Sequence, residues 1–158
     1  MGEAARRIDR LSTAPRFTAA DAEALNARFA GVPTLAMLRA VLREGLAGDV
    51  AAVSSFGAES AVLLHLIASI DRSVPVLFLD TGKHFPETLA YRDEIMKRLG
   101  MTNIVNLTPN AEALAARDGT GLRWSYDPDG CCEIRKVQPL AAALAHFDAS
   151  FTGRKGFQ

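Results

Sequence analysis

The first part of the chain spaces its apolar and polar positions as two helices do. Thr18, followed three positions later by Asp21, has the form of a capping box and opens a predicted helix that ends at Gly31. Thr34 then precedes apolar residues at helical spacing, which predicts a second helix. We therefore interpret residues 1–48 as a helical lead-in to the rest of the chain.

From residue 49 onward, short apolar runs alternate with longer helical patterns. The apolar runs predict buried strands at residues 50–54, 76–79, 104–107 and 149–152. The stretches between them predict helices at residues 59–70, 86–99, 111–116 and 131–145, with a Gly- and Asp-containing loop at residues 118–130. Strands that alternate with helices imply right-handed crossovers. We expect an α/β core at residues 49–158, with an open, largely parallel sheet and helices on both faces. Lead-in and core form one domain.

Composition narrows the classes of protein that fit this pattern. With 158 residues, 49% apolar and 23% charged, the chain has room for one ordinary globular domain. Lys plus Arg equals Asp plus Glu at 18 each, which argues against nucleic-acid and membrane partners. The longest apolar run, residues 61–70, is too short to span a bilayer, and the N-terminus has no secretory pattern. The two cysteines are neighbours and cannot join distant segments, so we expect a cytoplasmic protein.

The first candidate site is the loop after the first predicted strand. In open parallel sheets, ligands bind beyond the carboxyl ends of the strands, at the N-termini of helices. Hydroxyl groups and backbone N–H groups there could bind an anion, and the candidate residues are Ser54, Ser55, Phe56, Gly57 and Ser60. An ordinary capped turn remains the alternative, since neither common phosphate-loop pattern occurs in the chain.

Two further loops follow predicted strands and carry polar residues. The second loop could contact a ribose or the rim of a base through Leu79, Asp80, Thr81 and Gly82. The third could hold a phosphate or sulfate through Gly153, Arg154 and Lys155, since arginine suits bidentate contacts. The alternatives are a capped turn for the second loop and solvated surface charge for the third.

The cysteine pair is the fourth segment with possible chemistry. Cys131 and Cys132 stand at the start of a predicted helix, and Arg135 and Lys136 follow within one turn. A helix dipole and nearby cations favour thiolates, which a metal site or redox centre needs. Two cysteines are too few for a closed four-ligand site, and they could equally pack as small apolar residues.

Taken in order, these segments resemble the assimilatory adenylyl-sulfate and phosphoadenylyl-sulfate reductases, relatives of the PP-loop nucleotide-binding enzymes. The resemblance rests on Ser55 to Ser60, on Leu79 to Gly82 with Phe85-Pro86-Glu87-Thr88, on the cysteine segment, and on Thr152 to Lys155. It implies a modified phosphate loop in the first segment and an adenosine-binding edge in the second. It also implies that Arg154 and Lys155 lie near the phosphosulfate end of the substrate.

The resemblance extends to a cofactor and to partners. The Cys131-Cys132 pair with the residues after it is similar to the branch that carries a [4Fe-4S] cluster. Cys131 and Cys132 would be two of its four ligands, and Lys136 would lie between cluster and substrate. Members with this pair usually reduce adenylyl sulfate, and the others prefer its 3′-phosphorylated form. The family's reductant is thioredoxin or glutaredoxin, its products are sulfite and AMP, and a homo-oligomer is compatible with the pattern.

Departures from the family leave alternatives open. The family's second cysteine pair and its catalytic C-terminal cysteine lie further along than this chain reaches. We therefore expect a fold that lacks the family's C-terminal end, and no turnover by these 158 residues alone. One alternative is the small subunit of sulfate adenylyltransferase, which shares a stretch similar to residues 80–87 but has a fuller Ser-Gly-Gly loop. Another is a non-catalytic nucleotide- or metal-binding module, in which two chains pool Cys131 and Cys132 at a symmetry axis.

Overall fold

The computed structural model describes residues 16–154. The chain forms two compact units, residues 1–33 and 34–158, and the described part of the first contains the helix α2 (Ala19–Phe29). The Thr18 hydroxyl accepts a hydrogen bond from the Asp21 N–H at 3.3 Å, and the Asp21 carboxylate accepts one from the Thr18 N–H at 2.7 Å. The predicted capping box is therefore confirmed. Its hydrogen bonds lower the pKa of Asp21, because they stabilise the ionised carboxylate.

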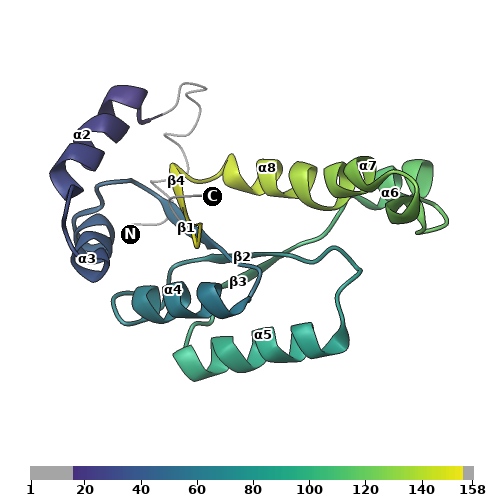
Figure 1. Ribbon diagram of the computed structural model, residues 1–158, viewed down its shortest axis with the longest axis horizontal. Coiled ribbons are helices and arrows are strands. Elements are labelled where there is room, and N and C mark those ends of the chain that lie inside the picture. Colours follow the sequence, from purple (N-terminus) through teal and green to yellow (C-terminus); the bar gives the residue numbers. More distant parts are fainter. Residues whose placement is uncertain (1–15, 155–158) are drawn as a thin grey trace, which may run out of the picture. The chain divides into compact units, whose positions relative to one another are not determined.

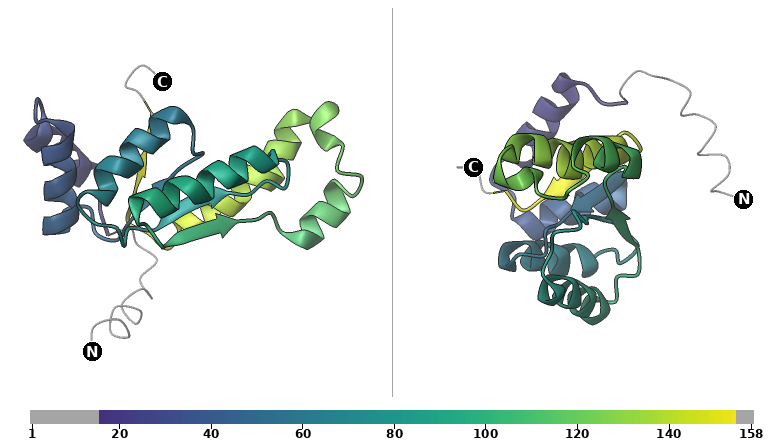
Figure 2. Two further views of the ribbon diagram at one scale, coloured as in Figure 1. Left: turned by 90° about the horizontal axis from the view of Figure 1, so that it is seen from below. Right: turned by 90° about the vertical axis from the view of Figure 1, so that its right-hand side faces the viewer.

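The second unit is a four-stranded sheet with helices on both faces, as predicted (Figure 1). Its elements are α3 (Thr34–Glu44), β1 (Val50–Val53), α4 (Ala58–Ala68), β2 (Val76–Leu79), α5 (Pro86–Leu99), β3 (Ile104–Leu107), α6 (Ala111–Arg117), a 3₁₀ turn (Arg123–Ser125), α7 (Pro128–Cys132), a π-helical turn (Glu133–Val137), α8 (Gln138–Leu144) and β4 (Ala149–Thr152). The strand order is β3-β2-β1-β4, and every pair is parallel. Figures 1 and 2 show α4 and α5 on one face of the sheet and α8 on the other.

The residue types account for the element boundaries. β2 is buried along most of its length, as expected of a central parallel strand covered on both faces. α5 begins with Pro86 in its first turn, where the missing N–H costs nothing. It ends at Gly100, whose φ of 66° is the left-handed conformation that glycine adopts easily. No helix within residues 16–154 is long and apolar enough to cross a membrane.

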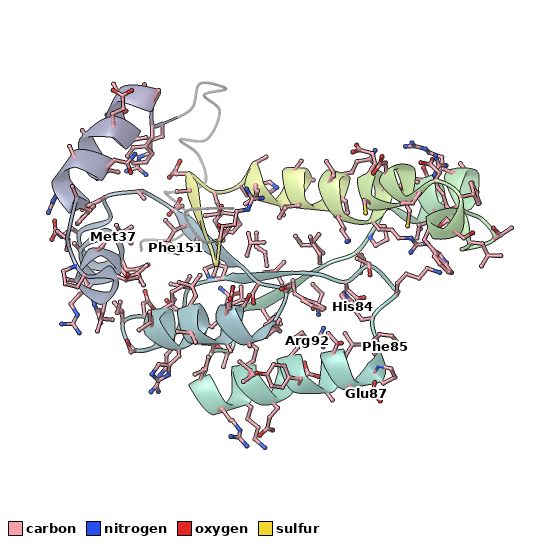
Figure 3. The ribbon with its side chains drawn as sticks, in the orientation of Figure 1. Met37, His84, Phe85, Glu87, Arg92 and Phe151 are labelled. Carbon is pink, nitrogen blue, oxygen red and sulfur yellow. The ribbon has the colours of Figure 1, made fainter. Side chains whose placement is uncertain are left out.

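The main hydrophobic core lies between the sheet and the pair α4 and α5. It consists of Ala52, Phe56, Leu64, Ile67, Ala68, Val74, Val76, Phe78, Met96 and Met101. The Phe78 ring is enclosed by polar neighbours as well: the His84 ring centroid is 4.9 Å away, and the Arg92 guanidinium lies 5.0 Å from the ring centroid. Both residues are labelled in Figure 3. The core thus extends to the carboxyl end of β2, where a polar loop begins.

The strand order changes direction at β1. Strands β1, β2 and β3 follow one another toward one edge, and the chain then returns to place β4 on the other side of β1. The loops that leave β1 and β4 therefore diverge at a topological switch point. In open α/β sheets, this is where ligands bind.

The cysteine segment differs from the single helix predicted at residues 131–145. Helix α7 begins earlier, at Pro128, because the Asp127 carboxylate caps it by accepting a hydrogen bond from the Gly130 N–H at 2.9 Å. A π-helical turn then separates α7 from α8. The predicted loop at residues 118–130 contains the 3₁₀ turn and the start of α7. The predicted helix at residues 131–145 is therefore present, but it begins three residues earlier than predicted and contains a π-helical turn.

Candidate functional site

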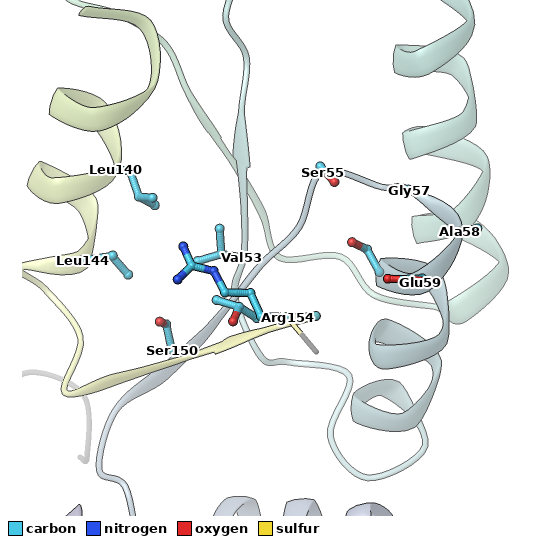
Figure 4. Close-up of a pocket in the computed structure, with 12 residues that line it drawn as sticks. Val53, Ser55, Gly57, Ala58, Glu59, Leu140, Leu144, Ser150 and Arg154 are labelled. Atoms are coloured by element: carbon cyan, nitrogen blue, oxygen red, sulfur yellow. The ribbon is translucent and has the colours of Figure 1, made fainter. Parts of the chain in front are cut away.

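A pocket of about 700 Å³ lies at the switch point between β1 and β4 (Figure 4). It is lined by Val53, Ser55, Gly57, Ala58, Glu59, Ser60, Leu140, Leu144, Ser150, Thr152, Gly153 and Arg154. The structure therefore brings together five predicted site residues, which are Ser55, Gly57, Ser60, Gly153 and Arg154. Its volume is in the usual range for small-molecule sites.

The loop that forms one wall of this pocket is held in shape from behind. Ser54 is buried, and its hydroxyl accepts a hydrogen bond from the Phe56 N–H at 3.0 Å. Phe56 has a φ of 57°, the left-handed region, which costs a residue other than glycine about 1–2 kcal/mol. Its ring is 4% exposed and packs edge-on against Phe78 at 5.6 Å. Core packing of Phe56 therefore maintains a backbone conformation that the residue would otherwise avoid.

The N-terminus of α4 faces the same pocket. Gly57 is the N-cap of α4 and, within the described residues, no side chain caps the helix there. The N–H groups of the first turn are thus available to a ligand, and the positive end of the helix dipole lies beside them. This combination favours an anion such as a phosphate group.

The opposite wall is the end of β4, which carries the cation of the site. The Arg154 side chain is exposed, and Figure 4 shows it extending across the pocket toward α8. Within residues 16–154 it forms neither an ion pair nor a hydrogen bond. Glu59 also lines the pocket, so its lining includes an acidic side chain as well as Arg154.

An apolar wall completes the pocket, and our sequence analysis missed it. Leu140 and Leu144 lie one helical turn apart on α8, and Val53 joins them from β1. The spacing of the two leucines was visible in the sequence, but only the placement of α8 over the sheet shows that they face this pocket. Such a wall keeps water from one side of the site, which strengthens electrostatic interactions within it.

Several predicted site residues lie outside the pocket lining. Ser54 and Phe56 are buried behind the first loop, and Lys155 is outside the described residues. The segment from Leu79 to Gly82 lies at the end of β2, where the Asp80 carboxylate accepts a hydrogen bond from the Gly82 N–H at 3.1 Å. Gly82 has a φ of 67°. This turn therefore has the capped geometry considered as the alternative, and its contact with a ligand stays a prediction.

The cysteines lie on a separate part of the fold. Cys131 is buried, Cys132 is half-buried, and both thiols are free. They stand four and five residues after Asp127, the N-cap of α7, and the helical backbone continues through the π-helical turn into α8, so both cysteines lie near the N-terminal end of this longer helix. Across residues 16–154, no group of three or more His, Cys, Asp or Glu residues could hold a metal ion. The two thiols nevertheless fit half of a four-thiolate ligand set.

The two cations after the cysteines point in different directions. Lys136 is exposed, whereas Arg135 is buried, donating to the Asp118 carboxylate at 2.6 Å and to the Thr81 carbonyl at 2.7 Å. Arg135 is therefore not a cation for the thiols. Its hydrogen bond, followed by one from the Arg123 N–H, lowers the pKa of Asp118. The Gly130 N–H and the Arg123 guanidinium lower the pKa of Asp127 in the same way.

Residues 49–158 match the family model of the phosphoadenosine phosphosulfate reductase domain. The chain belongs to this family. It is 50% identical over 153 residues to an adenosine 5′-phosphosulfate reductase of Mesorhizobium japonicum, a match that covers 97% of this chain and 60% of the relative. A reductase of the same name from a Chelativorans species is 50% identical over 151 residues, covering 94% of this chain and 62% of the relative. The chain thus spans about three fifths of the length of these curated relatives.

A solved structure supports the fold of this reductase family member. The phosphoadenylyl-sulfate reductase from Candida auris, crystallised as a phosphate complex, matches with a TM-score of 0.65 at 23% identity. The match covers 87% of this chain and 68% of that structure. The predicted family and the predicted parallel α/β fold are therefore both confirmed. The iron–sulfur branch of the family stays a prediction.

Proposed function

We propose that this chain supplies the nucleotide cradle of an enzyme that reduces adenylyl sulfate to sulfite and AMP, or its 3′-phosphorylated form to sulfite and adenosine 3′,5′-bisphosphate. The pocket at the switch point between β1 and β4 carries the proposal, because it is lined by a helix N-terminus and by an arginine that, among residues 16–154, have no side-chain cap and no ion pair, respectively. The reductase names of the relatives support the substrate class.

The residues have distinct proposed roles in binding. The N–H groups at the start of α4 would donate hydrogen bonds to a phosphate, and the hydroxyls of Ser55 and Ser60 would add further donors. Arg154 would bind the phosphosulfate end from the opposite wall. The turn from Leu79 to Gly82 would hold the adenosine.

In the proposed reaction, a cysteine thiolate outside this chain attacks the sulfur of the substrate. An S–S bond to the sulfonate forms while the bond between that sulfur and the phosphate oxygen breaks, and AMP, or adenosine 3′,5′-bisphosphate from the 3′-phosphorylated substrate, leaves. A dithiol reductant, thioredoxin or glutaredoxin, then attacks the enzyme sulfur and releases sulfite, becoming a disulfide overall. This chain would contribute binding and charge to the first step, so we expect no turnover by it alone.

Cys131 and Cys132 would hold two corners of a [4Fe-4S] cluster, with the remaining ligands supplied from outside the described residues. When bound, the cluster would supply a charged, polarisable group. The exposed Lys136 side chain, four residues after Cys132, would lie between the cluster and the substrate. Iron and acid-labile sulfide analysis of anaerobically purified protein tests this part by itself.

The test of the cradle is calorimetric titration of the anaerobic chain with adenylyl sulfate, its 3′-phosphorylated form and AMP. We expect saturable binding of adenylyl sulfate and AMP. Arg154→Ala is expected to weaken adenylyl sulfate binding about tenfold or more, since a hydrogen bond to a charged group contributes about 1.5–3 kcal/mol. Arg98→Ala is the matched control, because Arg98 pairs with Glu94 at 2.6 Å on the solvent-exposed side of α5, so its loss should leave the affinity unchanged.

Two results would contradict the proposal. Folded protein that binds none of the three nucleotides would remove the cradle assignment for this chain, and equal effects of the two arginine substitutions would remove Arg154 from the site. Cleavage of ATP to pyrophosphate in the presence of sulfate would instead favour the sulfate adenylyltransferase alternative. Iron bound by a dimer without nucleotide binding would favour the non-catalytic module.

A further inference from the structure

Arg135 joins three segments of the chain through one buried side chain. It belongs to the π-helical turn after the cysteines, and its side chain is 9% exposed against 0% for that of Asp118. One terminal nitrogen donates to the Thr81 carbonyl at 2.7 Å, and the other donates to the Asp118 carboxylate at 2.6 Å. The cysteine segment is therefore tied directly to the turn after β2 and to the end of α6.

The carboxylate in this bridge is itself held in place. The second oxygen of Asp118 accepts a hydrogen bond from the Arg123 N–H at 2.9 Å, which anchors the segment that leads into α7. A second link connects the same two loops, because the Lys83 ammonium donates to the Gly121 carbonyl at 2.6 Å. The turn at residues 80–83 and the segment at residues 118–132 are thus joined by two separate hydrogen-bonded links.

The local backbone explains why Arg135 turns inward while Lys136 does not. The π-helical turn at Glu133–Val137 widens the helix, and such turns are rare and occur often at functional sites. Ile134 and Arg135 are both buried, whereas Lys136 is exposed. The π-helical turn therefore directs Arg135 into the protein and leaves Lys136 exposed to solvent.

Stability is a weak reason for this arrangement. A buried ion pair can often be replaced by apolar residues without loss of stability, because both charges lose their hydration. The Nε of Arg135 is also buried and has no hydrogen-bond partner among the described residues, which adds a cost. The planar guanidinium instead fixes the position of its two acceptors, the Thr81 carbonyl and the Asp118 carboxylate, relative to each other.

We propose that Arg135 is a positioning residue that couples the turn at Thr81 and Gly82 to the cysteine pair, so that nucleotide bound at this turn changes the reactivity of Cys132. The proposal rests on the proposed function for the identity of the ligand. Cys132 is the suitable reporter because it is half-buried, whereas Cys131 is buried. A change in the turn moves the Thr81 carbonyl, and Arg135, which is bonded to this carbonyl, transmits the movement to Cys132, three residues earlier in the chain.

The test measures the modification rate of Cys132 by a thiol reagent in the metal-free chain, with and without saturating AMP. In the wild-type chain we expect AMP to change this rate about fivefold or more, the lower end of ordinary coupling between sites. The double substitution Asp118→Leu with Arg135→Met keeps the site filled without charge. It should bind AMP with nearly unchanged affinity by calorimetry, while the rate ratio falls to one. A purely structural role would not separate these two readouts.

Matched variants keep the test decisive. Glu94→Leu with Arg98→Met removes an ion pair of the same length on the surface of α5, and it should leave the rate ratio as in the wild type. If the buried double variant does not fold, Arg135→Lys is used, because lysine keeps the charge opposite Asp118 but cannot fork to Thr81; it too should lower the ratio. A folded variant that retains the wild-type ratio would overturn the proposal.

The thiol modification rates of the protein without nucleotide distinguish failure of the proposed function from failure of the positioning role. If AMP does not bind the wild-type chain, the function is at fault, and Arg135 is tested by comparing apo rates. Loss of the bridge should then accelerate Cys132 modification relative to the wild type and to the Glu94 and Arg98 control. Equal apo rates in all three proteins would refute the positioning role.

Discussion

The left-handed conformation of Phe56 leads to a prediction with an unusual sign. Phe56 has a φ of 57° and is 4% exposed, so a substitution here changes both the core packing and the backbone strain. Replacing a buried phenylalanine by alanine costs about 3–5 kcal/mol of unfolding free energy, and we expect Phe56→Ala to fall in this range. The informative quantity is the difference between alanine and glycine at this position.

Glycine is ordinarily the less stable of the two replacements. In a strand or helix it lowers the free energy of unfolding by about 0.5–1 kcal/mol relative to alanine, because it gains more freedom in the unfolded chain. At a left-handed position alanine carries a strain of about 1–2 kcal/mol that glycine does not. The two effects combine so that Phe56→Gly should be more stable than Phe56→Ala by about 0.5–1 kcal/mol.

Urea unfolding of four variants measures this inversion. The control pair is Phe151→Ala and Phe151→Gly, because Phe151 lies in the extended strand β4 and packs against the same core (Figure 3). There glycine should be the less stable, so the midpoints of the two pairs should differ in opposite directions. With an m-value of about 1–3 kcal/mol per molar urea, 1 kcal/mol shifts a midpoint by roughly 0.3–1 M. The same order of stability at both positions would refute the argument that packing holds Phe56 in strain.

Three further perturbations test other parts of the structure. Arg135 and the Arg123 N–H lower the pKa of Asp118 below its ordinary value of 3.8. The stability that the Asp118 carboxylate contributes is therefore complete above pH 3.8 and is lost as the pH falls toward the lowered pKa of the folded state. Asp118→Asn should flatten this acid dependence of the urea midpoint, and an unchanged pH profile would contradict the argument. Gly82→Ala should lower the free energy of unfolding by about 1 kcal/mol because φ there is 67°, and a midpoint equal to wild type would show that the turn adapts. Thr18→Ala should lose about 1 kcal/mol of helix stability, seen as faster amide exchange in α2 alone, and an unaltered exchange rate would mean that the capping box contributes nothing.

The sheet and most helices could be predicted because their signals are local. Buried parallel strands appear as short, continuous apolar runs, and the caps at Thr18, Pro86 and Gly100 mark helix ends by backbone chemistry that neighbours in the chain determine. The pocket followed from the same logic, since the carboxyl ends of parallel strands meet at one edge. The same rule had named the loops of Ser55, Gly57 and Arg154, which the structure brings into one pocket, and also the turn at residues 79–82, which lies outside the pocket lining.

What the sequence could not show depends on partners distant along the chain. Arg135 turns inward because its acceptors lie 17 and 54 positions away, at Asp118 and Thr81, and no spacing rule relates these residues. The φ of Phe56 is similar, because phenylalanine has no intrinsic preference for that region and only the core holds it there. Leu140 had an evident helical spacing, but the position of α8 over the sheet was needed to assign it to the pocket.

The pairing of β4 with β1 has a consequence for how the molecule assembles. Asp49 and Asp148 flank these strands, and the hydrogen bond between the Asp49 N–H and the Asp148 carboxylate, at 2.8 Å, joins residues 99 positions apart. Strands β1, β2 and β3 require much shorter loop closures, so they can pair while the rest of the chain is still being synthesised. The β4 wall of the pocket is therefore completed only when this long-range pairing forms, and a bound nucleotide would stabilise the pairing of β4 with β1.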